Sequence, residues 1–213
     1  MTTEGQGLAA VGDYNWVPQA RKFGQGFCAS FISGLASSDV IERLELREEP
    51  GRQGPDTVQI GTVEGGAIMI EYGGQAGVLL PVIRQLSQGT EIASVTRSDH
   101  HRSRFVHARD RYVISSFDPM FPEWHTSREP DDLRRNLEDL GMLVRSSGDD
   151  DGFFDQYLEG AFALAERYTG VRLRDYHIHQ GLPHRASIAH YYPSDFLSEF
   201  AWTPTAPAGS DEY

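Results

Sequence analysis

The chain has 213 residues, of which 31 are acidic and 19 basic, and its formal net charge is −12 with histidines neutral. A chain of this length buries roughly 70 per cent of its unfolded surface, so it supports a core without disulfides or metals. The acidic balance argues against nucleic acid and anionic membranes as partners, because both bind through clustered Lys and Arg.

The single cysteine, Cys28, excludes an intramolecular disulfide and a cysteine-based zinc site. Its apolar surroundings indicate a small buried side chain. Residues 1–7 have neither the basic nor the apolar segment of a signal peptide, and no apolar run reaches the roughly 18 residues of a membrane span. We therefore expect a cytoplasmic protein.

Local patterns divide the chain into a flexible N-terminus (1–13), one domain (14–202) and a disordered tail (203–213). Apolar or alternating runs predict strands at 27–33, 57–63, 67–72, 91–96, 104–108 and 112–117. Apolar residues at helical spacing, bounded by capping residues or glycines, predict helices at 39–44, 78–86, 130–140, 153–168 and 194–202.

The predicted strands occur in hairpins rather than alternating with helices. The pair at 57–72 turns at Glu64-Gly65-Gly66, and the pair at 104–117 turns at Arg109-Asp110-Arg111. This order predicts an α+β fold in which a mostly antiparallel sheet is covered by helices on one side.

Several short segments carry a resemblance to a known family. They are Phe27-Cys28-Ala29-Ser30-Phe31-Ile32-Ser33-Gly34, Ile70-Glu71-Tyr72-Gly73-Gly74, Gln85-Leu86-Ser87-Gln88-Gly89-Thr90, Ser116-Phe117-Asp118-Pro119, Asp131-Asp132-Leu133 and the stretch from Leu164 to Leu173. Over about residues 14–175 the chain resembles an uncharacterised actinobacterial family catalogued as a domain of unknown function. The resemblance implies a small cytoplasmic α+β domain and names no chemistry.

Histidines gather toward the C-terminus. If residues 176–180 form a strand, His177 and His179 lie on one side of it, an arrangement that suits Zn, Ni or Fe. No HExxH motif accompanies them, so surface or packing histidines are the alternative. The loop residues Asp99, His100 and His101 permit a second ligand site or a solvated turn.

Two carboxylates stand at the ends of predicted strands. Glu71 follows an apolar run, and Asp118 follows another strand. Such a pair could act as general acid and base if the pKa of one member were raised. The simpler interpretation is a backbone or arginine contact to Glu71. The sequence contains no serine nucleophile elbow, P-loop or dinucleotide fingerprint, so no cofactor is predicted.

The C-terminal half carries most of the negative charge: residues 1–110 have a net charge of −3 and residues 111–213 one of −9. An aromatic loop at 117–125 precedes this acidic stretch, and Trp and Phe are typical of binding hot spots, although packing against the sheet is the alternative. The predicted partner-binding residues are Phe121, Trp124, Asp131, Asp132, Glu138, Asp149, Asp150 and Asp151.

These observations favour a non-enzymatic interaction protein that binds a basic protein partner through its acidic C-terminal half, as an immunity protein does. Two alternatives stay open. One is a metal-dependent enzyme or ligand-binding protein that uses His177 and His179. The other is an accessory protein of a specialised biosynthetic pathway.

Overall fold

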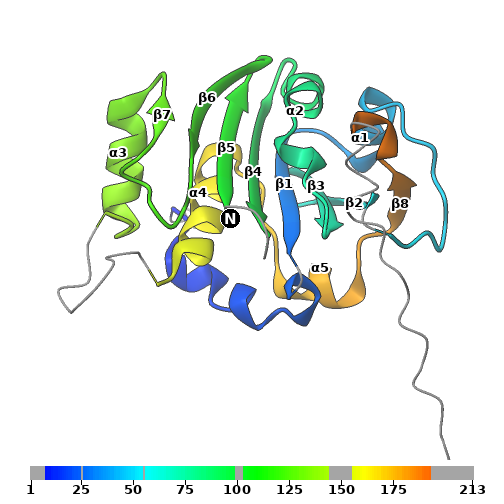
Figure 1. The fold of residues 1–213 in the computed structure, drawn as a ribbon, viewed down its shortest axis with the longest axis horizontal. Coiled ribbons are helices and arrows are strands. Elements are labelled where there is room, and N and C mark those ends of the chain that lie inside the picture. The colour runs from blue at the N-terminus through cyan, green and yellow to red at the C-terminus, as the bar shows by residue number, and fades with distance from the viewer. Residues whose placement is uncertain (1–7, 25, 55, 99–102, 144–154, 193–213) are drawn as a thin grey trace, which may run out of the picture.

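One antiparallel sheet of eight strands organises the protein (Figure 1). The computed structural model describes residues 8–24, 26–54, 56–98, 103–143 and 155–192. Across the sheet the strands follow the order β7-β6-β5-β4-β1-β3-β2-β8. The strands are β1 (Phe27–Ser33), β2 (Thr57–Val63), β3 (Gly66–Tyr72), β4 (Glu91–Arg97), β5 (Arg104–Arg109), β6 (Tyr112–Phe117), β7 (Thr126–Ser127) and β8 (His184–Ser187).

Helices connect the strands and cover the sheet. The α-helices are α1 (Ser37–Arg43), α2 (Leu80–Leu86), α3 (Pro130–Asp139), α4 (Tyr157–Thr169) and α5 (Asp175–Gln180). The short 3-10 helices are η1 (Val11–Tyr14), η2 (Val17–Gln19), η3 (Arg21–Phe23), η4 (Ala76–Val78) and η5 (Ala189–Tyr191). No helix in these described ranges is long and apolar enough to cross a membrane.

The two faces of the sheet bury different residues because side chains alternate along each strand. In β1, Phe27, Ala29 and Phe31 belong to one apolar cluster, whereas Ile32 belongs to another. We call the first side the α4 face and the second the η4 face. Both sides of the central strands are buried, which explains why β1 reads as an almost continuous apolar run.

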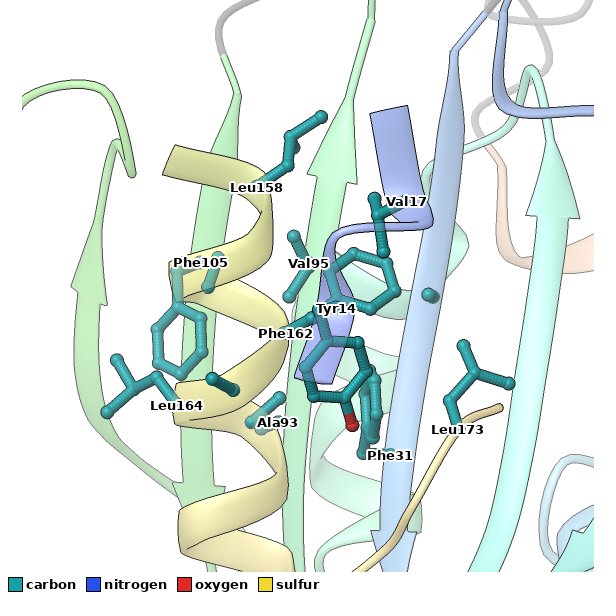
Figure 2. Close-up of a cluster of buried hydrophobic side chains, with 14 of the residues drawn as sticks. Tyr14, Val17, Phe31, Ala93, Val95, Phe105, Leu158, Phe162, Leu164 and Leu173 are labelled. Atoms are coloured by element: carbon teal, nitrogen blue, oxygen red, sulfur yellow. The ribbon is translucent and has the colours of Figure 1, made fainter. Parts of the chain in front are cut away.

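An aromatic cluster fills the α4 face (Figure 2). Phe162 of α4 lies at its centre and contacts aromatic rings from the N-terminal helices and β1. These rings belong to Tyr14, Trp16, Phe23, Phe27 and Phe31. The Tyr14 hydroxyl also donates a 2.7 Å hydrogen bond to Glu166, which ties η1 to α4.

The η4 face is covered by α1, α2, η4 and the stretch 184–192, which we call the C-terminal segment. β8 opens this segment and pairs with β2 at the sheet edge. Beyond β8, the Ile188 N–H donates to the Asp56 carbonyl, and His190 Nε2 lies 3.2 Å from the Leu44 carbonyl oxygen. The segment therefore crosses from the edge of the sheet onto its η4 face.

The predicted α+β fold with a mostly antiparallel sheet is confirmed. Helices lie on both faces, however, and not on one side as expected. The reason is that β1, β3 and β4 bury both sets of side chains, so each face needs its own cover. Within the segment predicted to be flexible, residues 8–13 are described, and Ala9 is buried beside the α4-face core.

One predicted strand is wrong. Residues 175–180 form the helix α5, and the edge strand β8 that follows was not predicted. The ammonium of Lys22, the only lysine of the chain, contacts the carbonyls of Ile178 and His179, which satisfies acceptors at the helix end. The helix predicted at 194–202 and the tail at 203–213 lie outside the described residues.

Candidate functional site

A layer of polar side chains lies within the otherwise apolar η4 face. Register places Cys28 of β1 between Glu71 of β3 and Thr96 of β4. Two residues further along, Ser30 lies opposite Ser94, and their hydroxyls are 2.9 Å apart. These five side chains are buried, and each comes from a central strand. The sheet thus assembles them from three separate parts of the sequence.

Helix η4 covers this layer, and Gly77 permits its close approach. A Cβ atom at position 77 would lie 2.2 Å from Ser30 Oγ and 2.8 Å from Cys28 Sγ. Both distances are shorter than a van der Waals contact, so any larger residue would displace η4 from the sheet. The glycine therefore serves packing, since its φ angle is ordinary.

Glu71 is the most unusual residue of this layer because its carboxyl group is fully buried. Its Oε1 accepts a 2.6 Å hydrogen bond from the Tyr192 hydroxyl, and its Oε2 accepts a 3.3 Å bond from the Gly77 N–H. Burial raises the pKa of Glu71 to about 7, because these hydrogen bonds only partly offset the loss of hydration.

No cation compensates this carboxylate within the part of the chain that the structure describes: neither Arg, Lys nor His pairs with Glu71 there. Burial, together with the neighbouring Glu71, raises the pKa of the Tyr192 hydroxyl and that of the Cys28 thiol well above their usual ranges. Both groups are thus neutral near neutral pH, and Glu71 is the member of the cluster that can exchange a proton in this range.

The expected partnership of Glu71 with Asp118 is wrong. β3 and β6 are separated by β1, β4 and β5 in the sheet, which places the two strands roughly 19 Å apart. The simpler expectation, a backbone contact to Glu71, is correct, with Gly77 as the donor. The sequence did not point to Tyr192, because nothing local links a tyrosine to a residue 121 positions away.

The two histidines proposed as metal ligands do not share one side of a strand. In α5 their side chains point in different directions, since two residues correspond to about 200° around a helix. His177 Nδ1 accepts a hydrogen bond from the Arg174 N–H, and burial lowers the pKa of His177. His179 contacts Asp175 at 2.9 Å. Among the described residues there is no group of three or more His, Cys, Asp or Glu able to hold a metal.

A second buried polar residue, His107, lies on the α4 face. Its ring stacks on Tyr168 of α4 with 4.1 Å between centroids and 6° between planes. Neither ring nitrogen has a hydrogen-bond partner, and the nearest charged atom recorded for it is Glu91 Oε1 at 3.6 Å from Nε2. His107 is therefore a sheet-face residue that packs as an aromatic ring, as expected from its place in the strand.

The aromatic loop before β7 is held by its own hydrogen bonds. Asp118 accepts from the N–H of Met120 and from that of Phe121, and the Phe121 carbonyl accepts from the Trp124 N–H. These turns stack the Trp124 indole on the Phe121 ring, with 5.3 Å between centroids and 18° between planes. Trp124 nevertheless has 74 per cent of its surface exposed.

Helix α3 follows this loop and β7 and lies at the same end of the sheet (Figure 1). Leu133 and Leu137 anchor it to the core, whereas Asp131 and Glu138 are exposed. Asp132 is half-buried and forms an ion pair with Arg135. The other predicted partner-binding residues (Asp149, Asp150 and Asp151), and the loop residues Asp99, His100 and His101, lie outside the described part of the chain.

Comparison with known proteins gives a family and no activity. A search of curated proteins and a search of solved structures found no match. A family model described as a family of unknown function, DUF6461, matches residues 55–189. This match confirms the predicted resemblance to a domain of unknown function and covers more than half of the chain. The chain therefore belongs to the DUF6461 family.

Proposed function

We propose that this protein is a cytoplasmic, non-enzymatic binding protein whose partner is a basic protein, and that residues 118–139 form the contact surface. We call these residues the aromatic–acidic surface. The observation that carries the proposal is the exposed Trp124 stacked on Phe121. The acidic character of α3, next along the chain, supports a basic partner.

Exposure of Trp124 leaves a large apolar surface in water that a partner could bury. A tryptophan buries about 150–250 Å² when it is covered, and such residues dominate binding energy at interfaces. The loop hydrogen bonds and the stack on Phe121 fix the indole in advance. Less conformational entropy is then lost on association, which favours affinity.

Charge around the aromatic stack fits a basic partner. Residues 118–139 include seven acidic and three basic side chains. Two of the arginines, Arg134 and Arg135, pair with acids of the same helix. The remaining negative charge attracts a positively charged surface over distances up to a Debye length, so the association should weaken as salt is added.

The proposal is tested by affinity capture from host-cell extract on three immobilised proteins: the wild type, Trp124→Ala and Tyr176→Ala. Tyr176 of α5 is the control because it is an aromatic residue with 52 per cent exposure outside the aromatic–acidic surface. A protein held by the wild type and by Tyr176→Ala is identified, purified and titrated against all three.

We expect a partner with net positive charge, release by high salt, and affinity reduced by about tenfold to 100-fold in Trp124→Ala alone. The proposal is wrong if the purified partner binds Trp124→Ala as tightly as the wild type, or if no salt-sensitive partner is recovered.

A further inference from the structure

The second inference concerns the buried pair of Glu71 and Tyr192 and is independent of the partner proposal. Tyr192 ends the described C-terminal segment and reaches across the η4 face to the polar layer. Its hydroxyl donates to Glu71 and accepts a 2.7 Å hydrogen bond from the Gln75 N–H beside η4. One side chain thus links the C-terminal segment, β3 and the start of η4.

Other contacts of the C-terminal segment lie at its beginning or at its surface. The Ser187 hydroxyl donates 2.8 Å to Asp56, and β8 pairs with β2. Tyr191, which is half-buried, hydrogen-bonds to Gln85. The Tyr192–Glu71 bond is therefore the innermost attachment of residues 189–192, and it depends on a group that gains and loses a proton.

The groups facing Glu71 leave its negative charge uncompensated. β1 contributes the Cys28 thiol, and the C-terminal segment contributes the Tyr192 hydroxyl. Asp56, which precedes β2, adds a repulsive negative charge. From η4 come backbone N–H groups of Ala76 and Gly77, while β2 places Val58 opposite Glu71. Within the described ranges, none of these groups is a cation.

We infer that Glu71 and Tyr192 form a proton-sensitive latch, in which loss of the Glu71 proton favours release of residues 189–192 from the η4 face. The physical reason is hydration: moving Tyr192 aside admits water to the carboxylate, and the charged form gains far more from water than the neutral form does. The closed state holds the proton more tightly than the open state, and the pKa of about 7 in the closed state is consistent with this.

The chain carries its own reporter of latch opening. Cys28 is the only cysteine, is fully buried beneath η4, and lies opposite Glu71 in the sheet. A thiol reagent such as 5,5′-dithiobis(2-nitrobenzoic acid) can react with it only after this region opens. Dividing the reaction rate by that of the urea-unfolded protein at the same pH removes the intrinsic pH dependence of the thiol.

For the wild type we expect this normalised rate to rise roughly tenfold or more between about pH 5.5 and 7.5, because the open and closed states bind the proton differently. Glu71→Gln should show a change of less than about twofold over the same range, since the amide does not titrate. Tyr192→Phe keeps the ring and removes the donor, so its excess over the wild type should widen as pH rises.

Repeating the assay in sub-denaturing urea separates latch opening from global unfolding. Opening of residues 189–192 exposes little surface, so urea should change the rate only slightly. The inference is overturned if the wild-type rate does not depend on pH, if Glu71→Gln shows the same rise, or if the rate follows urea as steeply as global unfolding does.

Discussion

The Tyr192 hydroxyl lies 2.6 Å from Glu71 Oε1, although the two residues are 121 positions apart in the chain. Their contact joins the C-terminal segment to a central strand and completes a polar layer with Cys28, Ser30 and Thr96. This layer is closed by η4, so its chemistry is that of proton exchange in the interior rather than contact with an external substrate.

Replacing Glu71 with Gln should remove a component of the pH dependence of stability. The folded-state pKa of Glu71, about 7, exceeds its ordinary value of 4.5, so the folded protein binds this proton more tightly than the unfolded chain. Stability from this group is therefore complete below about pH 4.5 and falls until about pH 7. The loss should be on the order of 3 kcal/mol.

Urea unfolding of wild type and Glu71→Gln from pH 4 to 8 measures this component as the difference between the two curves. Groups with lowered pKa values, such as Asp56, act at lower pH and cancel in the difference. A difference that does not vary with pH would contradict the prediction.

The fit of η4 against the sheet predicts that Gly77→Ala destabilises the fold. The added Cβ would meet Ser30 Oγ at 2.2 Å, so η4 must move, at a cost of about 1–3 kcal/mol. Gly12→Ala is the matched control, because a Cβ there has no neighbour within 4 Å. Thermal and urea unfolding should separate the two variants; equal stability would show that η4 tolerates the displacement.

His107 packs as a ring without hydrogen bonds, so Phe should replace it well. His107→Phe retains the stack on Tyr168 and removes two unsatisfied nitrogens, and we expect stability unchanged or raised by about 1 kcal/mol. His107→Ala loses the stack and should lose about 2–4 kcal/mol. A clear destabilisation of the Phe variant would instead assign a stabilising role to the Glu91 contact.

The exposed and buried aromatic residues should respond differently to truncation. Trp124→Ala should change the free energy of unfolding by less than about 0.5 kcal/mol, because the indole is exposed. Phe162→Ala removes the centre of the α4-face cluster and should lose about 3–5 kcal/mol. Denaturant titration checks both values; a large loss in Trp124→Ala would assign Trp124 to the core.

Local patterns predict most strands and helices well. The strands at 27–33, 57–63 and 112–117 have the bounds that alternation and glycine turns indicate, because hairpin geometry is encoded by neighbouring residues. Helix α4 begins at Tyr157 and ends at Gly170, whose left-handed φ of 68° suits a glycine stop.

Features set by distant residues are not predictable in this way. Residues 175–180 alternate like a strand, yet Lys22 from the N-terminal region stabilises them as a helix. The sequence identified Glu71 as a titratable candidate but assigned it the wrong partner, because the strand order that separates it from Asp118 is a tertiary property. The exposed stack of Phe121 and Trp124 required the loop geometry.

The most direct test is a carbon-13 NMR titration of the glutamate side-chain carboxyls, with Glu71→Gln used to assign the Glu71 signal. We predict that Glu71 titrates with a midpoint near pH 7 in the folded protein, and at higher pH in Tyr192→Phe, since the donor to its charged form is lost. A Glu71 midpoint near 4.5, unchanged by Tyr192→Phe, would contradict the account of an uncompensated buried carboxylate held by Tyr192.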